Sequence, residues 1–227
     1  GNHLSMFMNP QGDPMEQLVG WFMFAHEFFH LWNGKTLRFS DTETDWFKEG
    51  VSNYYTLKAL HQIGLATEPA IFGILDGLFY QRYVNDPGFG TLAPAKAASG
   101  FDKDDHWGLI YGGGLFTGLS IDLEIRHKTE NRQSLDDLMR HLYLNYGGSD
   151  RLIDEKAILE VANELGNTDF TQLIQPCIQG PGEVPLARYL EYAGLEAETE
   201  SGQLLLRHST NPSAIEKDIW EGVLGGN

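Results

Sequence analysis

The sequence has a single cysteine, Cys177, among its 227 residues. No disulfide can therefore form within the chain, and the fold must rest on side-chain packing or on a bound metal. Basic residues are also scarce, since 16 Lys and Arg stand against 32 Asp and Glu and give a formal net charge of −16 with His neutral. So acidic a chain is poorly suited to phosphate backbones and anionic membrane surfaces, and we expect no nucleic-acid partner.

Long hydrophobic runs are missing as well. The apolar run at residues 18–25, which includes Gly20, has eight residues and is far shorter than the ~20 needed to cross a bilayer, so we expect no membrane span. Hydrophobic residues at 41% and charged residues at 21% are ordinary values for a folded globular chain. The lack of disulfides is compatible with either the cytoplasm or the periplasm.

The apolar pattern near the N-terminus is helical. Leu18, Phe22, His26 and His30 step by four residues, which predicts a helix over 13–33. Thr42 and Asp45 have the spacing of a capping box, which predicts a second helix running to residue 60. Two helices joined by so short a connection are expected to form an αα-hairpin.

The remaining pattern predicts a mainly α fold with at most a small β element near the C-terminus. Helices are expected over 68–84, 110–129, 135–146, 154–165, 169–178 and 186–193, a strand over 203–207, and an irregular loop over 85–106. We expect one domain over residues 1–227. Within it, residues 1–12 are an expression remnant or an extended lead-in, and residues 183–227 are a C-terminal extension packed on the rest.

The strongest chemical motif is His26-Glu27-Phe28-Phe29-His30, an H-E-x-x-H pattern on the first predicted helix. Residues four apart share one face of a helix, so His26 and His30 can bind one Zn²⁺ while Glu27 serves as a general base. The alternative is a pair of core histidines without metal. It is disfavoured because buried imidazoles without polar partners lose solvation.

A catalytic zinc site needs a third protein ligand, and Glu49 on the second predicted helix is the candidate, with 18 residues between it and His30. The hairpin would bring Glu49 back against the first helix. Asn53, one turn further on, could accept the free N–H of a zinc-bound imidazole.

These motifs resemble the glycyl aminopeptidase family of gluzincin zinc metallopeptidases. The resemblance rests on HEFFHLWN at 26–33, WFKEG at 46–50 with Tyr54-Tyr55 after it, and further matches at 111–114, 122–126 and 134–139. It implies a thermolysin-like helical catalytic domain holding one Zn²⁺ on His26, His30 and Glu49. It also implies that Glu27 is the general base and that the Tyr111 hydroxyl stabilises the oxyanion.

Two family features have no counterpart in this sequence. Gluzincin exopeptidases carry a β-region before the zinc helix whose glutamate grips the substrate amine, and glycyl aminopeptidases add a PDZ domain after the catalytic part. We therefore expect both in a longer protein. Trp107 lies close in sequence to Tyr111 and is expected to line the substrate cleft.

The predicted function is zinc-dependent hydrolysis of a peptide substrate. The resemblance alone adds that the enzyme is an aminopeptidase releasing Gly or Ala. Three alternatives stay open: an endopeptidase or other amide hydrolase, a catalytically silent domain that holds zinc, and a helical bundle without metal.

Overall fold

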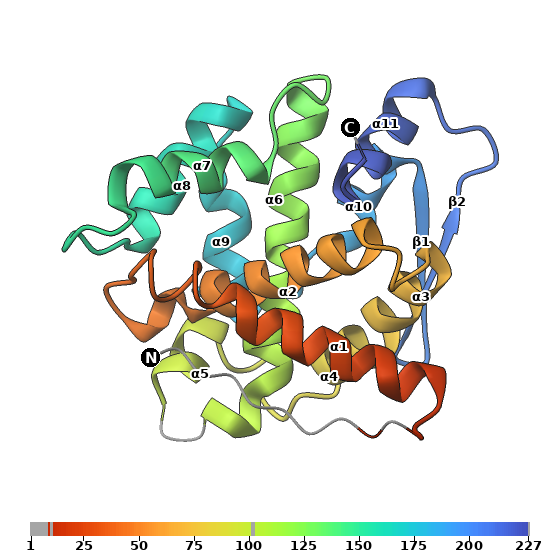
Figure 1. Cartoon of the computed structure of the whole chain (residues 1–227). Helices are drawn as coiled ribbons and strands as arrows, with labels where there is room; N and C mark the ends of the chain where they lie inside the picture. Colours follow the sequence, from red (N-terminus) through yellow and green to blue (C-terminus); the bar gives the residue numbers. More distant parts are fainter. Residues whose placement is uncertain (1–8, 10, 101–102, 227) are drawn as a thin grey trace.

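The structure, a computed structural model, describes residues 9, 11–100 and 103–226 (Figure 1). It is mainly helical with one β-hairpin near the C-terminus, as predicted. The helices are α1 (Pro14–Phe29), α2 (Asp45–Gln62), α3 (Glu68–Ile74), α4 (Gln81–Val84), α5 (Pro94–Ser99), α6 (Gly114–Lys128), α7 (Leu135–Tyr146), α8 (Glu155–Gly166), α9 (Thr171–Cys177), α10 (Leu186–Leu190) and α11 (Ala214–Val223). Shorter segments are the 3₁₀ turns η1 (Thr42–Thr44), η3 (Lys103–His106) and η5 (Glu191–Ala193) and the π-helical segments η2 (Leu75–Tyr80) and η4 (Gly108–Gly113).

Helices α2 and α6 form the centre of the fold and cross each other (Figure 1). Helix α1 packs on the outer side of α2, and α7, α8 and α9 lie on one side of α6. On the other side lie α10, α11 and the antiparallel hairpin of β1 (Leu195–Glu200) and β2 (Gln203–His208). This arrangement places the H-E-x-x-H helix next to the helix that carries Glu49.

The first helix buries the face that the sequence pattern predicts. Leu18, Phe22 and His26 are its buried residues, and Asp13 caps its N-terminus by accepting hydrogen bonds from the backbone N–H groups of Met15 and Glu16. The helix ends at Phe29, earlier than the predicted boundary, because the chain turns there. The αα-hairpin with α2 is confirmed by their packing.

The predicted capping box at Thr42 and Asp45 is wrong. Helix α2 continues directly from the 3₁₀ turn η1, and no side chain caps either segment. The Thr44 hydroxyl instead donates to the Asp41 carbonyl at 2.7 Å. A tight turn thus begins the helix in place of a side-chain cap. A capping box does open α7, where Ser134 and Asp137 hydrogen-bond each other's backbone N–H.

Glycine permits the close crossing of α2 and α6. A Cβ on Gly50 would lie 2.1 Å from the carbonyl carbon of Gly114, and one on Gly114 would lie 2.3 Å from the Trp46 carbonyl oxygen. The glycines of residues 112–114 all serve close packing, because a side chain at any of the three would press on a neighbouring segment. The crossing brings Glu49 beside the segment that carries Tyr111.

The structure contains three elements that the sequence analysis does not predict, α5, β1 and α11. The region 85–106 is not uniformly irregular, because it contains α5, whose Pro94 stands at the start of an alanine-rich stretch. Strand β1 and helix α11 were missed. The sequence of β1, LEAETE, is too charged to suggest a strand, but it pairs with β2 from Leu195↔His208 to Glu200↔Gln203. Most of the predicted lead-in over 1–12 lies outside the described residues.

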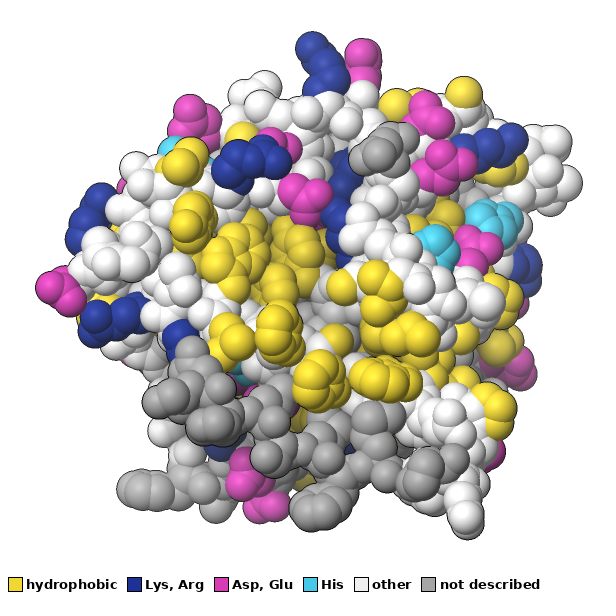
Figure 2. Space-filling model, viewed as in Figure 1, with side chains coloured by type: hydrophobic (Ala, Val, Ile, Leu, Met, Phe, Trp, Pro, Cys, Tyr) yellow, Lys and Arg dark blue, Asp and Glu magenta, His cyan; other side chains and the backbone are white. Residues whose placement is uncertain are grey.

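An exposed apolar face covers α1 and the adjoining end of α2 (Figure 2). Its members have exposed fractions between 36% and 67%, and they are Trp21, Phe24, Phe28, Ile63 and Leu65. Together with neighbouring residues they line a groove of about 260 Å³. Helix α1 is therefore apolar both where it packs on the core and where it meets solvent.

Candidate metal centre

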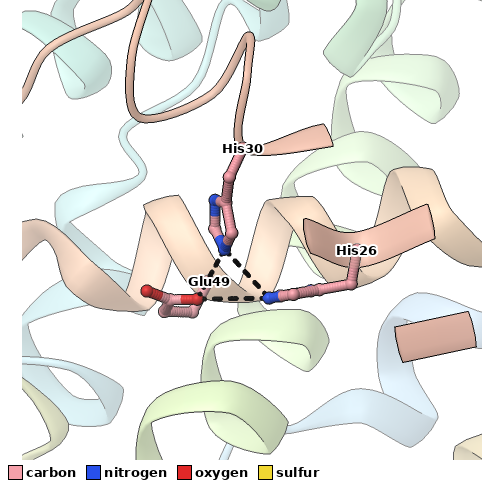
Figure 3. A group of neighbouring side chains, drawn as sticks. All are labelled: His26, His30 and Glu49. Atoms are coloured by element: carbon pink, nitrogen blue, oxygen red, sulfur yellow. Dashed lines mark hydrogen bonds and ion pairs between the residues drawn. The ribbon is translucent and has the colours of Figure 1, made fainter. Parts of the chain in front are cut away.

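His26, His30 and Glu49 converge on one point (Figure 3). The His30 Nε2 lies 2.9 Å from the His26 Nε2 and 3.0 Å from the Glu49 Oε2. The distance from the His26 Nε2 to the Glu49 Oε2 is 3.3 Å. In Figure 3 the His30 ring points down, the His26 ring points in from the right, and both meet the Glu49 carboxylate. The hairpin thus assembles the three predicted ligands.

The spacing of these three atoms fits a zinc ion. Bonds of about 2.0–2.1 Å in a tetrahedral site separate neighbouring ligand atoms by about 3.3 Å. The observed separations of 2.9–3.3 Å match this value or fall a few tenths of an ångström below it. His26 and Glu49 are buried, and His30 is half-buried. Two imidazoles and one carboxylate form a donor set that suits zinc and leaves a fourth position open.

The hydrogen bond on the far side of His30 also favours a cation. The His30 Nδ1 lies 2.9 Å from the Asn33 carbonyl oxygen, which can only accept, so Nδ1 carries a proton. In the neutral ring the Nε2 lone pair then points at the Glu49 carboxylate and at His26. Such a meeting of lone pairs is unfavourable unless a proton or a metal ion lies between them. The donor set therefore fits a metal.

The electrostatics of the cluster agree with this reading. Burial works against the charged form of His30, but the hydrogen bond and charge of Glu49 outweigh it and raise the His30 pKa above its ordinary value. Burial also works against the charged form of Glu49, which for a carboxylate means that it would raise the pKa. Hydrogen bonds with His26 and His30 and the charge of Lys48 instead bring that pKa far below its ordinary value. Glu49 is thus an ionised carboxylate, as a zinc ligand must be.

Glu49 belongs to an ion-pair network that also contains Lys48, Asp45 and Lys103. The Lys48 Nζ lies 3.4 Å from the Glu49 Oε1, the carboxylate oxygen that faces away from the histidines. Asp45, which is only 2% exposed, binds Lys48 at 2.5 Å through one oxygen and Lys103 at 2.5 Å through the other. This network leaves the Glu49 Oε2 for the metal. It also ties α2 to the segment that leads to Trp107.

Glu27 and Tyr111 lie next to the cluster. Glu27 is exposed on α1, and its charge acts on both His30 and Tyr111. The Tyr111 ring lies 6.0 Å from the His26 ring and belongs to the π-helical segment η4, a kind of irregularity frequent at functional sites. Burial, with the charges of Glu49, Asp45 and Glu27, raises the pKa of Tyr111 well above its ordinary value. Its hydroxyl therefore stays protonated and can donate.

Asn53 has a different partner from the one expected. Its Nδ2 donates to the Tyr111 carbonyl at 3.3 Å, and neither imidazole donates to it. Asn33 supplies the acceptor for His30, while the His26 Nδ1 is buried without a partner among the described residues. Asn53 lies one turn beyond Glu49, on the side of α2 that faces η4 rather than α1. It therefore connects the ligand helix to the Tyr111 segment.

Trp107 stacks on the Tyr111 ring at 5.0 Å and on the Phe79 ring at 5.5 Å. The Arg82 guanidinium lies 5.1 Å from the Trp107 ring. Trp107 is half-buried, so part of its ring reaches solvent beside Tyr111. The structure thus brings Trp107 next to the predicted site, where it supports the tyrosine.

Sequence reasoning missed the groups that support the ligands. Asn33 was noted only as a helix end, yet its buried side chain donates to the Lys48 carbonyl and to the Ser52 hydroxyl. Lys48 and Asp45 carry a usable signal, a charged i, i+3 pair directly before Glu49. Lys103 has none, because it lies 58 residues from its partner Asp45.

The comparison with protein families bears on this site. Residues 21–111 match the sequence model of the M61 glycyl aminopeptidase family. The resemblance that the motifs indicate is therefore confirmed for this segment, which holds all seven predicted site residues. The matched family is one of peptidases. A comparison with curated protein sequences finds no match.

The fold is similar to that of a solved member of the aminopeptidase N family. A crystal structure of an aminopeptidase N family protein from Idiomarina loihiensis superposes with a TM-score of 0.72 at 19% identity. The match covers 87% of this chain and 36% of that protein, so the chain spans about a third of its length. Within the described ranges, no helix is long and apolar enough to cross a membrane.

Proposed function

We propose that this chain is a zinc-dependent peptidase whose metal ligands are His26, His30 and Glu49. The convergence of their three donor atoms within 2.9–3.3 Å of one another carries the proposal. The peptidase family match over residues 21–111 and the aminopeptidase fold support it. An open fourth position is typical of catalytic zinc rather than of structural zinc.

The residues around the ligands suit the hydrolysis of an amide. Zinc, when bound, would activate water near neutral pH and polarise a carbonyl oxygen. Glu27, exposed next to the ligands, would accept a proton from the attacking water and pass it to the leaving amine. The protonated Tyr111 hydroxyl would donate to the oxyanion, an interaction typically worth ~2.7–4 kcal/mol. Trp107 and Asn53 would hold Tyr111 in place.

The preferred substrate in this proposal is a peptide with a free amine and a small N-terminal residue, Gly or Ala. This preference follows from the similarity to the glycyl aminopeptidases. The amine-gripping β-region and the PDZ domain of the family are, in the same proposal, parts of a longer protein.

Amine release tests the proposal. The chain would be loaded with one equivalent of zinc and assayed on Gly-, Ala-, Leu- and Arg-amides and on one N-blocked peptide, with and without a chelator. Glu27→Gln should lower turnover by about 10²–10⁴-fold while zinc remains bound. Glu16→Gln, which changes another exposed glutamate of α1, is the matched control and should leave turnover unchanged.

The other outcomes separate the rival functions. Cleavage of the blocked peptide alone would indicate an endopeptidase. Bound zinc without turnover of any substrate would indicate either a domain that holds zinc without catalysis or a catalytic core that needs the rest of the longer protein. Failure to bind zinc at all would exclude every zinc-dependent function and leave a helical bundle without metal.

A further inference from the structure

A second polar site lies at the far end of α6 from Tyr111. It is a cavity of about 230 Å³ between α6, α9 and α10, and we refer to it as the Glu124 pocket. None of the proposed zinc-site residues line it. Thirteen residues of helical rise separate Tyr111 from Glu124, a distance of about 20 Å along the axis. The Glu124 pocket is therefore separate from the proposed catalytic centre.

One oxygen of the buried Glu124 carboxylate has no hydrogen-bond donor among the described residues. Glu124 is 6% exposed, and its Oε2 is buried without a hydrogen bond from any described residue. The other oxygen has one distant contact, with the Lys128 Nζ at 3.7 Å. A buried carboxylate oxygen without a donor is costly, because it has lost its water without gaining a replacement. A ligand that donates to this oxygen would offset the cost.

The charge of the lining favours a cation. Asp169 and Glu183 also line the Glu124 pocket, so three acidic residues line it. Arg188 is the only Lys or Arg among the lining residues. Its side chain is exposed, and its guanidinium lies 5.5 Å from the Tyr189 ring. The excess of acidic over basic residues in the lining favours the binding of a positively charged group.

The spacing of these carboxylates argues against a metal ion. Among the described residues, the only group of three or more His, Cys, Asp or Glu able to hold an ion is the zinc triad. Asp169, Glu183 and Glu124 therefore do not converge closely enough to ligate one metal. An organic cation, whose several N–H groups are spread over more space, suits this arrangement better.

Apolar residues form much of the remaining wall, and the volume is small. Phe170, Leu173, Cys177 and Tyr189 are buried residues that line the cavity. A volume of about 230 Å³ lies below the ~300–1,000 Å³ of pockets for drug-sized ligands. We propose that the Glu124 pocket binds an alkylammonium or alkylguanidinium group, with Glu124 as its buried counter-ion and the apolar wall against its alkyl chain.

Such a group could come from a free small molecule or from a lysine or arginine side chain. Calorimetry with the zinc-loaded chain would use agmatine as the free molecule and acetyl-Gly-Arg-Gly-amide as the peptide. Pentylurea, which matches an alkylguanidinium in shape but lacks the charge, is the ligand control. We expect at least one of the two cations to bind with a Kd of about 1 mM or lower and pentylurea to bind at least about tenfold more weakly.

Variants locate the binding. Glu124→Gln preserves the shape of the side chain and should weaken cation binding about tenfold or more. Asp169→Asn at the exposed rim should weaken it only a few-fold. Glu160→Gln, at an exposed glutamate of α8 that does not line the cavity, should have no effect. Thermal unfolding of each variant establishes that it is folded.

Three results would overturn the proposal: no binding of either cation up to about 10 mM, equal binding of pentylurea, or unchanged cation affinity in folded Glu124→Gln. Binding of agmatine without the peptide would support it and identify the source as a free small molecule. Binding of the peptide would support it and identify a side chain as the source. Neither result depends on peptidase activity.

Discussion

Helices α1 and α6 have similar lengths but opposite relations between sequence and burial. The sequence of α1, PMEQLVGWFMFAHEFF, is mostly apolar, yet only Leu18, Phe22 and His26 are buried. The sequence of α6, GLFTGLSIDLEIRHK, includes several polar and charged residues, yet every residue from 114 to 126 is buried. Hydrophobicity along the chain thus fails to rank these two helices by burial.

The difference follows from position and from polar partners. Helix α6 lies between the α7–α9 group and the C-terminal elements, so all its sides are covered (Figure 1). Several of its polar groups find partners there, as Asp122 accepts from Tyr54, Arg126 and the Leu135 N–H at 2.6–2.7 Å. Helix α1 has α2 on one side only and leaves its apolar face exposed (Figure 2).

The largest expected effect is on α6. Asp122→Ala would leave the Arg126 guanidinium and the Tyr54 hydroxyl buried without their acceptor. We expect the free energy of unfolding to fall by about 3–5 kcal/mol, measured by urea denaturation. Asp150→Ala, at a fully exposed aspartate paired with Arg38, is the control and should change it by less than about 1 kcal/mol. Equal effects would show that α6 is less buried than described.

The next effect concerns the crossing of α2 and α6. Gly50→Ala would place a Cβ 2.1 Å from the Gly114 carbonyl carbon and force the two backbones apart, costing about 3 kcal/mol or more. A Cβ on Gly77 would have no atom of a neighbouring segment within 4 Å, so Gly77→Ala should change stability by about 1 kcal/mol or less. Thermal unfolding compares the two variants. A Gly50→Ala protein as stable as the parent would contradict the close crossing.

A smaller effect is expected where α2 supports the ligands held by α1. Lys48→Met removes the ammonium 3.4 Å from the Glu49 Oε1 and should lower zinc affinity about 10–100-fold, measured by competition with a chromophoric chelator. Lys96→Met, at an exposed lysine of α5, should leave the affinity unchanged. The same zinc affinity in both variants would exclude a role for Lys48 in positioning Glu49.

A pH effect is expected where α2 meets α7. Burial would raise the pKa of Asp136, but hydrogen bonds from Lys58 and Tyr55 outweigh it and lower that pKa. The folded-state pKa is therefore below the unfolded value of 3.8, so this stabilisation is present above pH 3.8 and is lost as the pH falls below it. Asp136→Asn should flatten that part of the profile, by less than about 1 kcal/mol because the pair is partly exposed. An unchanged acid profile would contradict the pairing.

The smallest effect is expected on the exposed side of α1. Phe28→Ser, at a side chain that is 59% exposed, should change the unfolding free energy by only about 0.5 kcal/mol. Phe22→Ala on the buried side of the same helix should cost about 3–5 kcal/mol. A large loss from Phe28→Ser would mean that another part of the molecule covers this face.

Much of the site could be predicted because its parts are local. The i, i+4 spacing of His26 and His30 places both rings on one face of any helix, and a short hairpin returns Glu49 to that face. The π-helical irregularity at Tyr111 could not be predicted, nor could the partner of Asn53. Both depend on how closely α2 approaches η4, which the glycines of two distant segments decide together.

The sequence by itself determined the mainly helical fold, the metal donor set and the core face of α1, because these depend on residue type and on spacing within a few turns. Only the tertiary structure decided that α6 would be buried and one face of α1 exposed, and that Asp45 would join Lys48 to Lys103. It also decided that the Glu124 Oε2 would lie buried without a hydrogen bond from any described residue. The physical reason is that burial and charge pairing depend on segments far apart in the chain. A local sequence pattern does not specify which of those segments will contact each other.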